Sequence, residues 1–87
     1  MIKIWAKVMK NNKIVKHTTF FNNAEKMDWS LFFDYVSQIC HSLDIPTPII
    51  LKTHIFNYAK FNFVRFKKDD FIESVDFDNL WLENGDR

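Results

Sequence analysis

Residues 28–48 read DWSLFFDYVSQICHSLDIPTP, and this stretch decides the fold. Its apolar side chains recur at the helical period of 3.6 residues and form one stripe, at Phe32, Val36, Ile39 and Leu43. Asp28 is the predicted N-cap, and Pro46 and Pro48 are expected to end the helix. We therefore predict one long amphipathic helix packed on a sheet, with an apolar arc wide enough for a second element to cover its flank.

The segment before this helix predicts a β-hairpin. Residues 2–10 alternate apolar and polar side chains, which is the period of a half-buried strand. Asn11-Asn12 then forms a two-residue turn, because asparagine tolerates positive φ, and residues 13–20 return as a second strand. Residues 21–27 are polar and are expected to form a loop.

The C-terminal half predicts shorter elements. Residues 49–51 are interpreted as a short strand, followed by a short helix that Thr53 caps and that runs through Ala59. Residues 61–66, FNFVRF, alternate again and predict another strand.

The remaining residues add one turn and one strand. Asp70 and Glu73 have the spacing of a capping box for a single helical turn. A last strand is predicted over residues 78–83, with Leu80 and Leu82 on one face and Trp81 on the other. Residues 1–87 are therefore expected to form a single α+β domain: an N-terminal β-hairpin, the long helix on a mainly antiparallel sheet, and a C-terminal half with a short helix and further strands.

Composition fits a small folded domain. The chain has 87 residues, of which 47% are hydrophobic and 17% aromatic, so it is not a disordered segment. No apolar run is long enough for a signal peptide or a membrane span, so no membrane association is expected. A single cysteine, Cys40, fits a reducing compartment, and we expect a cytoplasmic location.

The charges are divided between the two ends of the chain. The first 17 residues contain no acid and five lysines, Lys3, Lys7, Lys10, Lys13 and Lys16. The last 19 residues contain seven acids against the single Arg87, and the formal net charge of the chain is only +1. We interpret this division as a prediction that the two ends are neighbours, with Lys3, Lys7 and Lys16 facing Glu83 and nearby acids. The alternative is a basic surface left free for an anionic partner.

Residues 59–66 match part of the strand signature of the RNA recognition motif. The aromatic spacing agrees at Phe61, Phe63 and Phe66, but Lys60 takes the glycine position and Asn62 the small-residue position. A phenylalanine-rich strand is more often part of the core, so nucleic acid is not the favoured partner. The alternative hypothesis is a single-stranded nucleic-acid-binding surface made of Lys3, Lys7, Lys60, Phe61, Phe63 and Arg65.

No set of side chains predicts catalysis, a metal or a cofactor. Cys40, His41, His17 and His54 lack the paired spacing of a zinc site. Cys40 falls in the last turn of the predicted helix, where a thiolate is disfavoured, and is expected to be a buried core residue. Asp76 and Asp78 are interpreted as a solvated pair. We therefore expect a protein that is not an enzyme.

The stretches FFDYVSQICHSLDIPTPIIL and DDFIESVDFDNLWLE resemble those of a small bacterial protein family of similar length. The resemblance covers most of the chain and implies no activity and no functional residue. The favoured hypothesis is a non-enzymatic interaction or scaffold module that binds a protein partner or forms a homodimer. Its expected surface consists of Trp5, Met9 and Trp81, because all three alternate out of the predicted core face.

Overall fold

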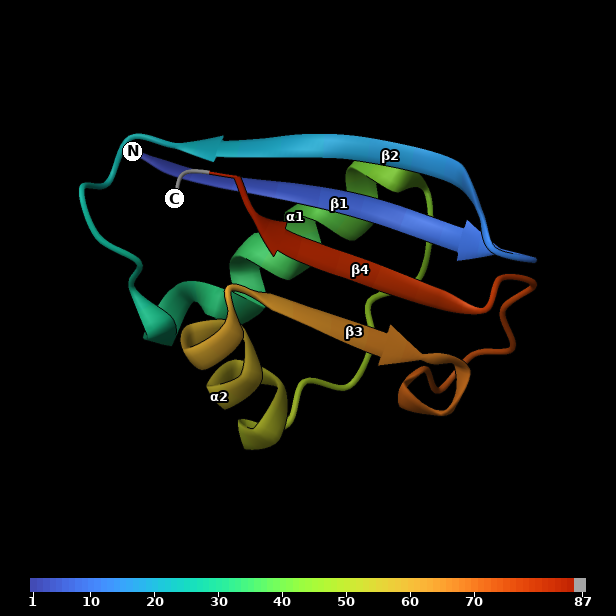
Figure 1. Ribbon diagram of the computed structural model, residues 1–87. Helices are drawn as coiled ribbons and strands as arrows, with labels where there is room; N and C mark the ends of the chain where they lie inside the picture. The colour runs from blue at the N-terminus through green and yellow to red at the C-terminus, as the bar shows by residue number, and fades with distance from the viewer. Residues whose placement is uncertain (86–87) are drawn as a thin grey trace.

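Four antiparallel strands form one sheet, and two helices cover one of its faces (Figure 1). The computed structural model describes residues 1–85. The elements in chain order are β1 (Ile2–Lys10), β2 (Lys13–Asn22), the short 3-10 helix η1 (Trp29–Leu31), α1 (Phe32–Leu43), α2 (Lys52–Phe61), β3 (Phe63–Lys67), the 3-10 turn η2 (Lys68–Asp70) and β4 (Asn79–Asn84). The strand order is β2-β1-β4-β3. The predicted α+β class is confirmed.

The β-hairpin is confirmed, including its turn. Asn11 and Asn12 have φ angles of 54° and 63°, which asparagine adopts more readily than most residues. The second strand is longer than predicted, because β2 continues through Asn22 before the loop begins. The register shifts between Val8 and Met9, so the hairpin contains a bulge near its turn.

The long helix is confirmed, with corrections at both ends. Asp28 caps η1 and not α1: its Oδ1 accepts the Ser30 N–H at 3.0 Å. α1 ends at Leu43, three residues before Pro46, because Asp44 adopts the left-handed conformation and the Ile45 N–H donates to the Cys40 carbonyl at 3.0 Å. The predicted stripe is buried, and Tyr58 of α2 packs on Phe32 with ring centroids 5.5 Å apart.

The prediction for the segment between the helices was wrong in two respects. Residues 49–51 form no strand, and the Ile49 N–H donates instead to the Asp70 carbonyl at 2.7 Å. The cap of α2 is Leu51 rather than Thr53. Nδ1 of His54 accepts the Leu51 N–H at 2.9 Å, so a histidine side chain satisfies the donor at the start of the helix.

β3 begins two residues later than predicted. α2 extends to Phe61 and ends with Asn62 in the left-handed conformation, so Phe61 belongs to a helix and not to the strand. The single turn also lies elsewhere: η2 ends at Asp70 instead of beginning there, and Oδ2 of Asp70 accepts the N–H of the N-cap residue Lys67 at 2.8 Å.

The last strand is confirmed to within one residue, and it brings the two ends of the chain together. β4 pairs with β1 and directs Leu80 and Leu82 into the core, while Trp81 lies on the opposite face. The Gly85 N–H donates to the Lys3 carbonyl at 2.9 Å. The predicted proximity of the ends is therefore confirmed; Asp86 and Arg87 lie outside the described residues.

Within residues 1–85, the predicted charge pairing holds for Lys7, while Lys3 and Lys16 form no ion pair. Lys7 Nζ lies 3.9 Å from Glu83 Oε1. Lys16 is separated from β4 by β1, and its Nζ donates to the Leu43 carbonyl at 3.0 Å, where it satisfies the C-terminal end of α1. Within the described part of the chain, no helix has the length and hydropathy needed to cross a bilayer.

Candidate functional site

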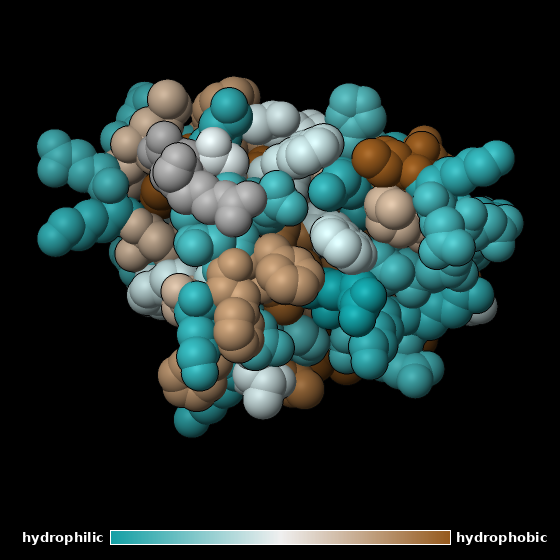
Figure 2. Space-filling view, in the orientation of Figure 1, coloured by the Kyte–Doolittle hydropathy of each residue, from teal (hydrophilic) through white to brown (hydrophobic). Residues whose placement is uncertain are grey.

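The sheet face opposite the two helices is left uncovered, and we call it the open face. Directly paired residues on neighbouring strands share a face, so the register identifies its members. They are Lys3, Trp5, Lys7, Met9, Ile14, His17, Thr19, Phe21, Phe63, Arg65, Lys67, Asn79, Trp81 and Glu83. Figure 2 shows many hydrophilic (teal) side chains over this view of the sheet, with a group of hydrophobic (tan) ones near its centre.

Each of the four strands contributes one aromatic ring to the open face. Phe21, Trp5 and Phe63 are 56%, 37% and 38% exposed, and Trp81 between them is partly buried. The Phe63 and Trp81 ring centroids are 5.4 Å apart at an angle of 37°. The rings therefore form a staggered row across the sheet, of which Trp5, Phe21 and Phe63 are the more exposed members.

Cationic side chains alternate with these rings. Lys7 Nζ lies 4.1 Å from the centroid of Trp5 and 5.1 Å from that of Trp81. On either side of this group, Lys3 Nζ is 5.7 Å from the Phe21 centroid and Arg65 Cζ is 5.9 Å from that of Trp81. Cation–π contacts of this kind hold the long basic side chains against the rings.

The open face is more positive than the rest of the protein. Among residues 1–85, this face has four cations, Lys3, Lys7, Arg65 and Lys67, and one acid, Glu83, which gives it a formal charge of +3 with His17 neutral, while the whole chain carries +1. Glu83 lies beside Lys7, and the other three cations form no ion pair within residues 1–85. An anionic ligand would therefore meet a favourable potential on this face.

The structure brings together most of the residues predicted from the sequence. Trp5, Met9 and Trp81 share the open face, and so do Lys3, Lys7, Phe63 and Arg65 from the alternative hypothesis. Lys60 and Phe61 do not join them, since both lie at the end of α2. The two hypotheses thus describe one surface.

Two members of the open face, Phe21 and Lys67, were predicted to lie outside the strands. Phe21 was assigned to a loop because the polar pair that follows it suggested an early end of the strand. The predicted strand 61–66 ends one residue before Lys67, whereas β3 includes it. The sequence did contain a signal for Phe21. In a strand that continues past residue 20, Phe21 lies on the same face as Thr19 and His17.

Cys40 is confirmed as a core residue. Its side chain is fully buried, and this burial raises the pKa of the thiol to about 11, partly offset by a hydrogen bond from Thr47. Within residues 1–85, no three His, Cys, Asp or Glu side chains converge on one point.

We expect a thiol reagent such as a disulfide-exchange dye to modify native Cys40 at pH 8 far more slowly than in the urea-unfolded chain, because the protonated buried thiol is a poor nucleophile. The modification rate in the native protein should be limited by unfolding events that expose the thiol, and it should therefore rise with urea concentration. Equal rates in native and unfolded protein would contradict the burial.

His54 is buried, and its contacts are structural. Besides accepting the Leu51 N–H, it has its Nε2 3.4 Å from Asp70 Oδ2, and its ring lies 4.5 Å from the ring of Phe66. Asp78 likewise acts in a turn, since its Oδ2 accepts the Asn11 N–H at 2.8 Å, and Asp76 lies 4.0 Å from Lys10.

No protein-family model, curated protein or solved structure matches this chain.

Proposed function

We propose that this protein is a non-enzymatic module that binds single-stranded nucleic acid on its open face. The observation that carries the proposal is the row of four rings, one from each strand, with cations between them. Exposed rings on a sheet stack bases, and the neighbouring cations contact phosphates. The sequence alone favoured a protein partner. We now favour nucleic acid, because Phe63 is exposed and not part of the core.

Charge argues against self-association through the same face. Two copies placed face to face would oppose two surfaces of formal charge +3, and such like-charge contacts cost several kcal/mol. An anionic partner is favoured, and among anionic partners nucleic acid is the one that uses the rings.

The three cations without an ion pair set the expected salt dependence. Lys3, Arg65 and Lys67 can each neutralise one phosphate, whereas Lys7 lies against Glu83. With three phosphate contacts, the logarithm of the binding constant for a single strand should fall with the logarithm of salt concentration at a slope of about −2.

The Trp81→Ala variant should lose about 1–3 kcal/mol of binding free energy for a fluorescein-labelled single-stranded 10-mer, because one stacking platform is removed. Fluorescence anisotropy at 50 mM and 200 mM salt measures both affinity and salt slope. Phe56→Ala is the matched control, since Phe56 is 69% exposed on α2, away from the open face. Arg65→Ala, at an exposed position, should reduce the steepness of the salt slope by about 0.7 without removing a ring.

Three results would contradict the proposal. The first is no salt-dependent binding of any single-stranded DNA or RNA at 50 mM salt. The second is Trp81→Ala binding as tightly as Phe56→Ala. The third is equal affinity for polyglutamate and oligonucleotide, unaffected by Trp81→Ala; this would indicate an acidic protein partner instead.

A further inference from the structure

A groove runs along the outer edge of β3, where the sheet meets α2. Its volume is about 440 Å³, within the range of small-molecule sites, and it is lined by Asn57, Phe61, Phe63, Val64, Arg65 and Lys67. β3 is an edge strand, so this side of it faces no other strand. Phe63, Arg65 and Lys67 also belong to the open face, so the groove continues that surface around the edge of the sheet.

The lining combines three kinds of group that a nucleotide requires. The Phe61 ring, 54% exposed, and the Phe63 ring, 38% exposed, offer aromatic surface for a base. Arg65 and Lys67 offer cations for a phosphate, and Lys60 adds a third beside the groove, with Nζ 5.5 Å from the Phe61 centroid. In the described part of the chain, residues 1–85, no acidic side chain lines the groove.

Asn57 adds a neutral hydrogen-bonding side chain to the groove. It lies one helical turn before Phe61 on α2 and is exposed. A carboxamide both donates and accepts hydrogen bonds, as the edges of bases do. The rings of the open face stack any base, whereas this amide can distinguish one base from another.

We propose that the groove at the β3 edge is a nucleotide subsite: a base packs against Phe61 and Phe63, its edge meets Asn57, and its phosphate meets Arg65 and Lys67. The proposal rests on the proposed function, because the same strand continues from the open face into the groove. The proposal also assigns a role to Phe61, which lies outside the sheet because β3 begins at Phe63.

The test compares Phe61→Ala with Phe56→Ala, two exposed phenylalanines of the same helix, only the first of which lines the groove. Labelled oligo(dT) and oligo(dA) 10-mers are titrated at 50 mM salt. Phe61→Ala should bind about fivefold or more weakly than wild type, and Phe56→Ala within about twofold. Asn57→Ala should bring the two affinities closer together, because the base-distinguishing group is removed.

The outcomes separate this inference from the proposed function. If Trp81→Ala weakens binding and Phe61→Ala matches Phe56→Ala, the subsite is overturned and the open face stands. If Phe61→Ala weakens binding and Trp81→Ala does not, the subsite stands and the open-face function is overturned. If wild type binds neither oligonucleotide, both are overturned. An unchanged affinity ratio in Asn57→Ala overturns the role of the amide alone.

Discussion

Replacing Phe66 by alanine is expected to lower the free energy of unfolding by about 3–5 kcal/mol, which is a large share of the total stability of a domain this size. Phe66 has no exposed surface and lies in the middle of β3, paired with Leu80 of β4. Its ring also packs on His54 at 4.5 Å, and His54 satisfies the first turn of α2. The truncation therefore leaves a cavity where the edge strand, α2 and η2 meet.

Urea unfolding followed by circular dichroism measures this loss, and Phe56→Ala is again the control. Phe56 is 69% exposed, so its truncation should change the free energy of unfolding by no more than about 0.5 kcal/mol. A loss below about 1.5 kcal/mol for Phe66→Ala, with an unchanged slope against urea, would show that the core at β3 does not pack as described.

The same strand carries the core and the binding surface. Val64 and Phe66 are buried against the helices, while Phe63, Arg65 and Lys67 alternate onto the open face. A shift of one residue in the register would exchange the two sets. The burial of Phe66 in the core therefore also fixes the register of β3, and with it the position of the proposed ligand-binding side chains.

Elements with strong local signals were predicted well. The hairpin has an unbroken two-residue alternation and a turn made of two asparagines, and both are consequences of nearby residues alone. α1 has a regular apolar stripe, and β4 alternates Leu80, Trp81 and Leu82. In each case the residues that decide the structure are adjacent in the sequence.

The C-terminal half was predicted less well because distant residues decide its structure. Ile49 bonds to the backbone of Asp70, and His54 lies beside the Asp70 carboxylate, so the loop and the start of α2 depend on a residue about twenty positions away. Phe61 was assigned to a strand because FNFVRF alternates. The helix instead continues to that residue, and Asn62 ends it in the left-handed conformation.

The members of the site were predictable, but their assembly was not. Alternation alone indicates that Trp5 and Trp81 leave the core face. That Trp81 lies between Trp5 and Phe63, with Lys7 and Arg65 beside it, follows from the order β2-β1-β4-β3. No local pattern contains the strand order, so the sequence supported two separate hypotheses where the structure has one surface.

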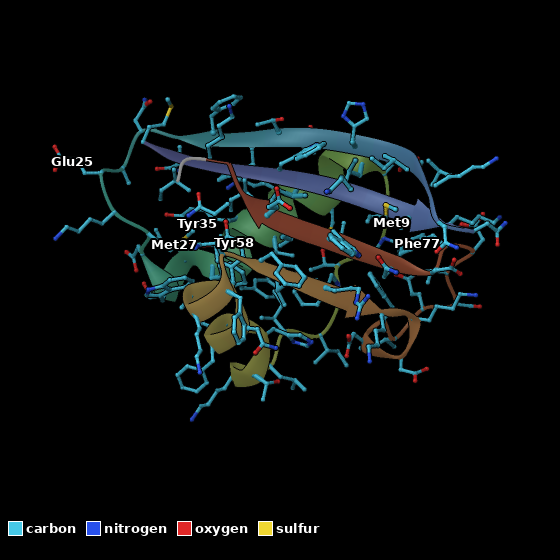
Figure 3. The ribbon with its side chains drawn as sticks, viewed as in Figure 1. Met9, Glu25, Met27, Tyr35, Tyr58 and Phe77 are labelled. Atoms are coloured by element: carbon cyan, nitrogen blue, oxygen red, sulfur yellow. The ribbon has the colours of Figure 1, made fainter. Side chains whose placement is uncertain are left out.

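Raising the pH from 9 to 12 is expected to destabilise the fold through two buried groups. Tyr58 is 3% exposed, and burial, with a smaller contribution from the charge of Glu83, raises its pKa from 10.0 to about 12. Tyr58 lies on the helix side of the sheet (Figure 3), and its hydroxyl has no hydrogen-bond partner within residues 1–85. Burial raises the pKa of Cys40 from 9.0 to about 11.

The sign follows from proton binding. Between pH 10 and 12 the native Tyr58 keeps a proton that the unfolded chain has lost, so the native state binds more protons and the free energy of unfolding falls as pH rises. Cys40 acts in the same way between pH 9 and 11. A pKa shift of this size corresponds to about 2–3 kcal/mol of unfolding free energy for each group. This contribution is present below the pKa of the group in the unfolded chain and is lost above its pKa in the native protein.

The Tyr58→Phe variant isolates one of these contributions. Because the lost hydroxyl is buried and unpartnered within residues 1–85, we expect unchanged stability at pH 7 or a gain of up to about 1 kcal/mol. Between pH 10 and 12 the variant should lose about 2–3 kcal/mol less than wild type, as measured by urea unfolding at several pH values. Cys40→Ala is the matched control, because it should flatten the earlier part of the decline, from pH 9 to 11, and leave the later part intact. Parallel curves for wild type and Tyr58→Phe would mean that the tyrosine hydroxyl reaches solvent, since only a buried phenol keeps its proton at pH 11.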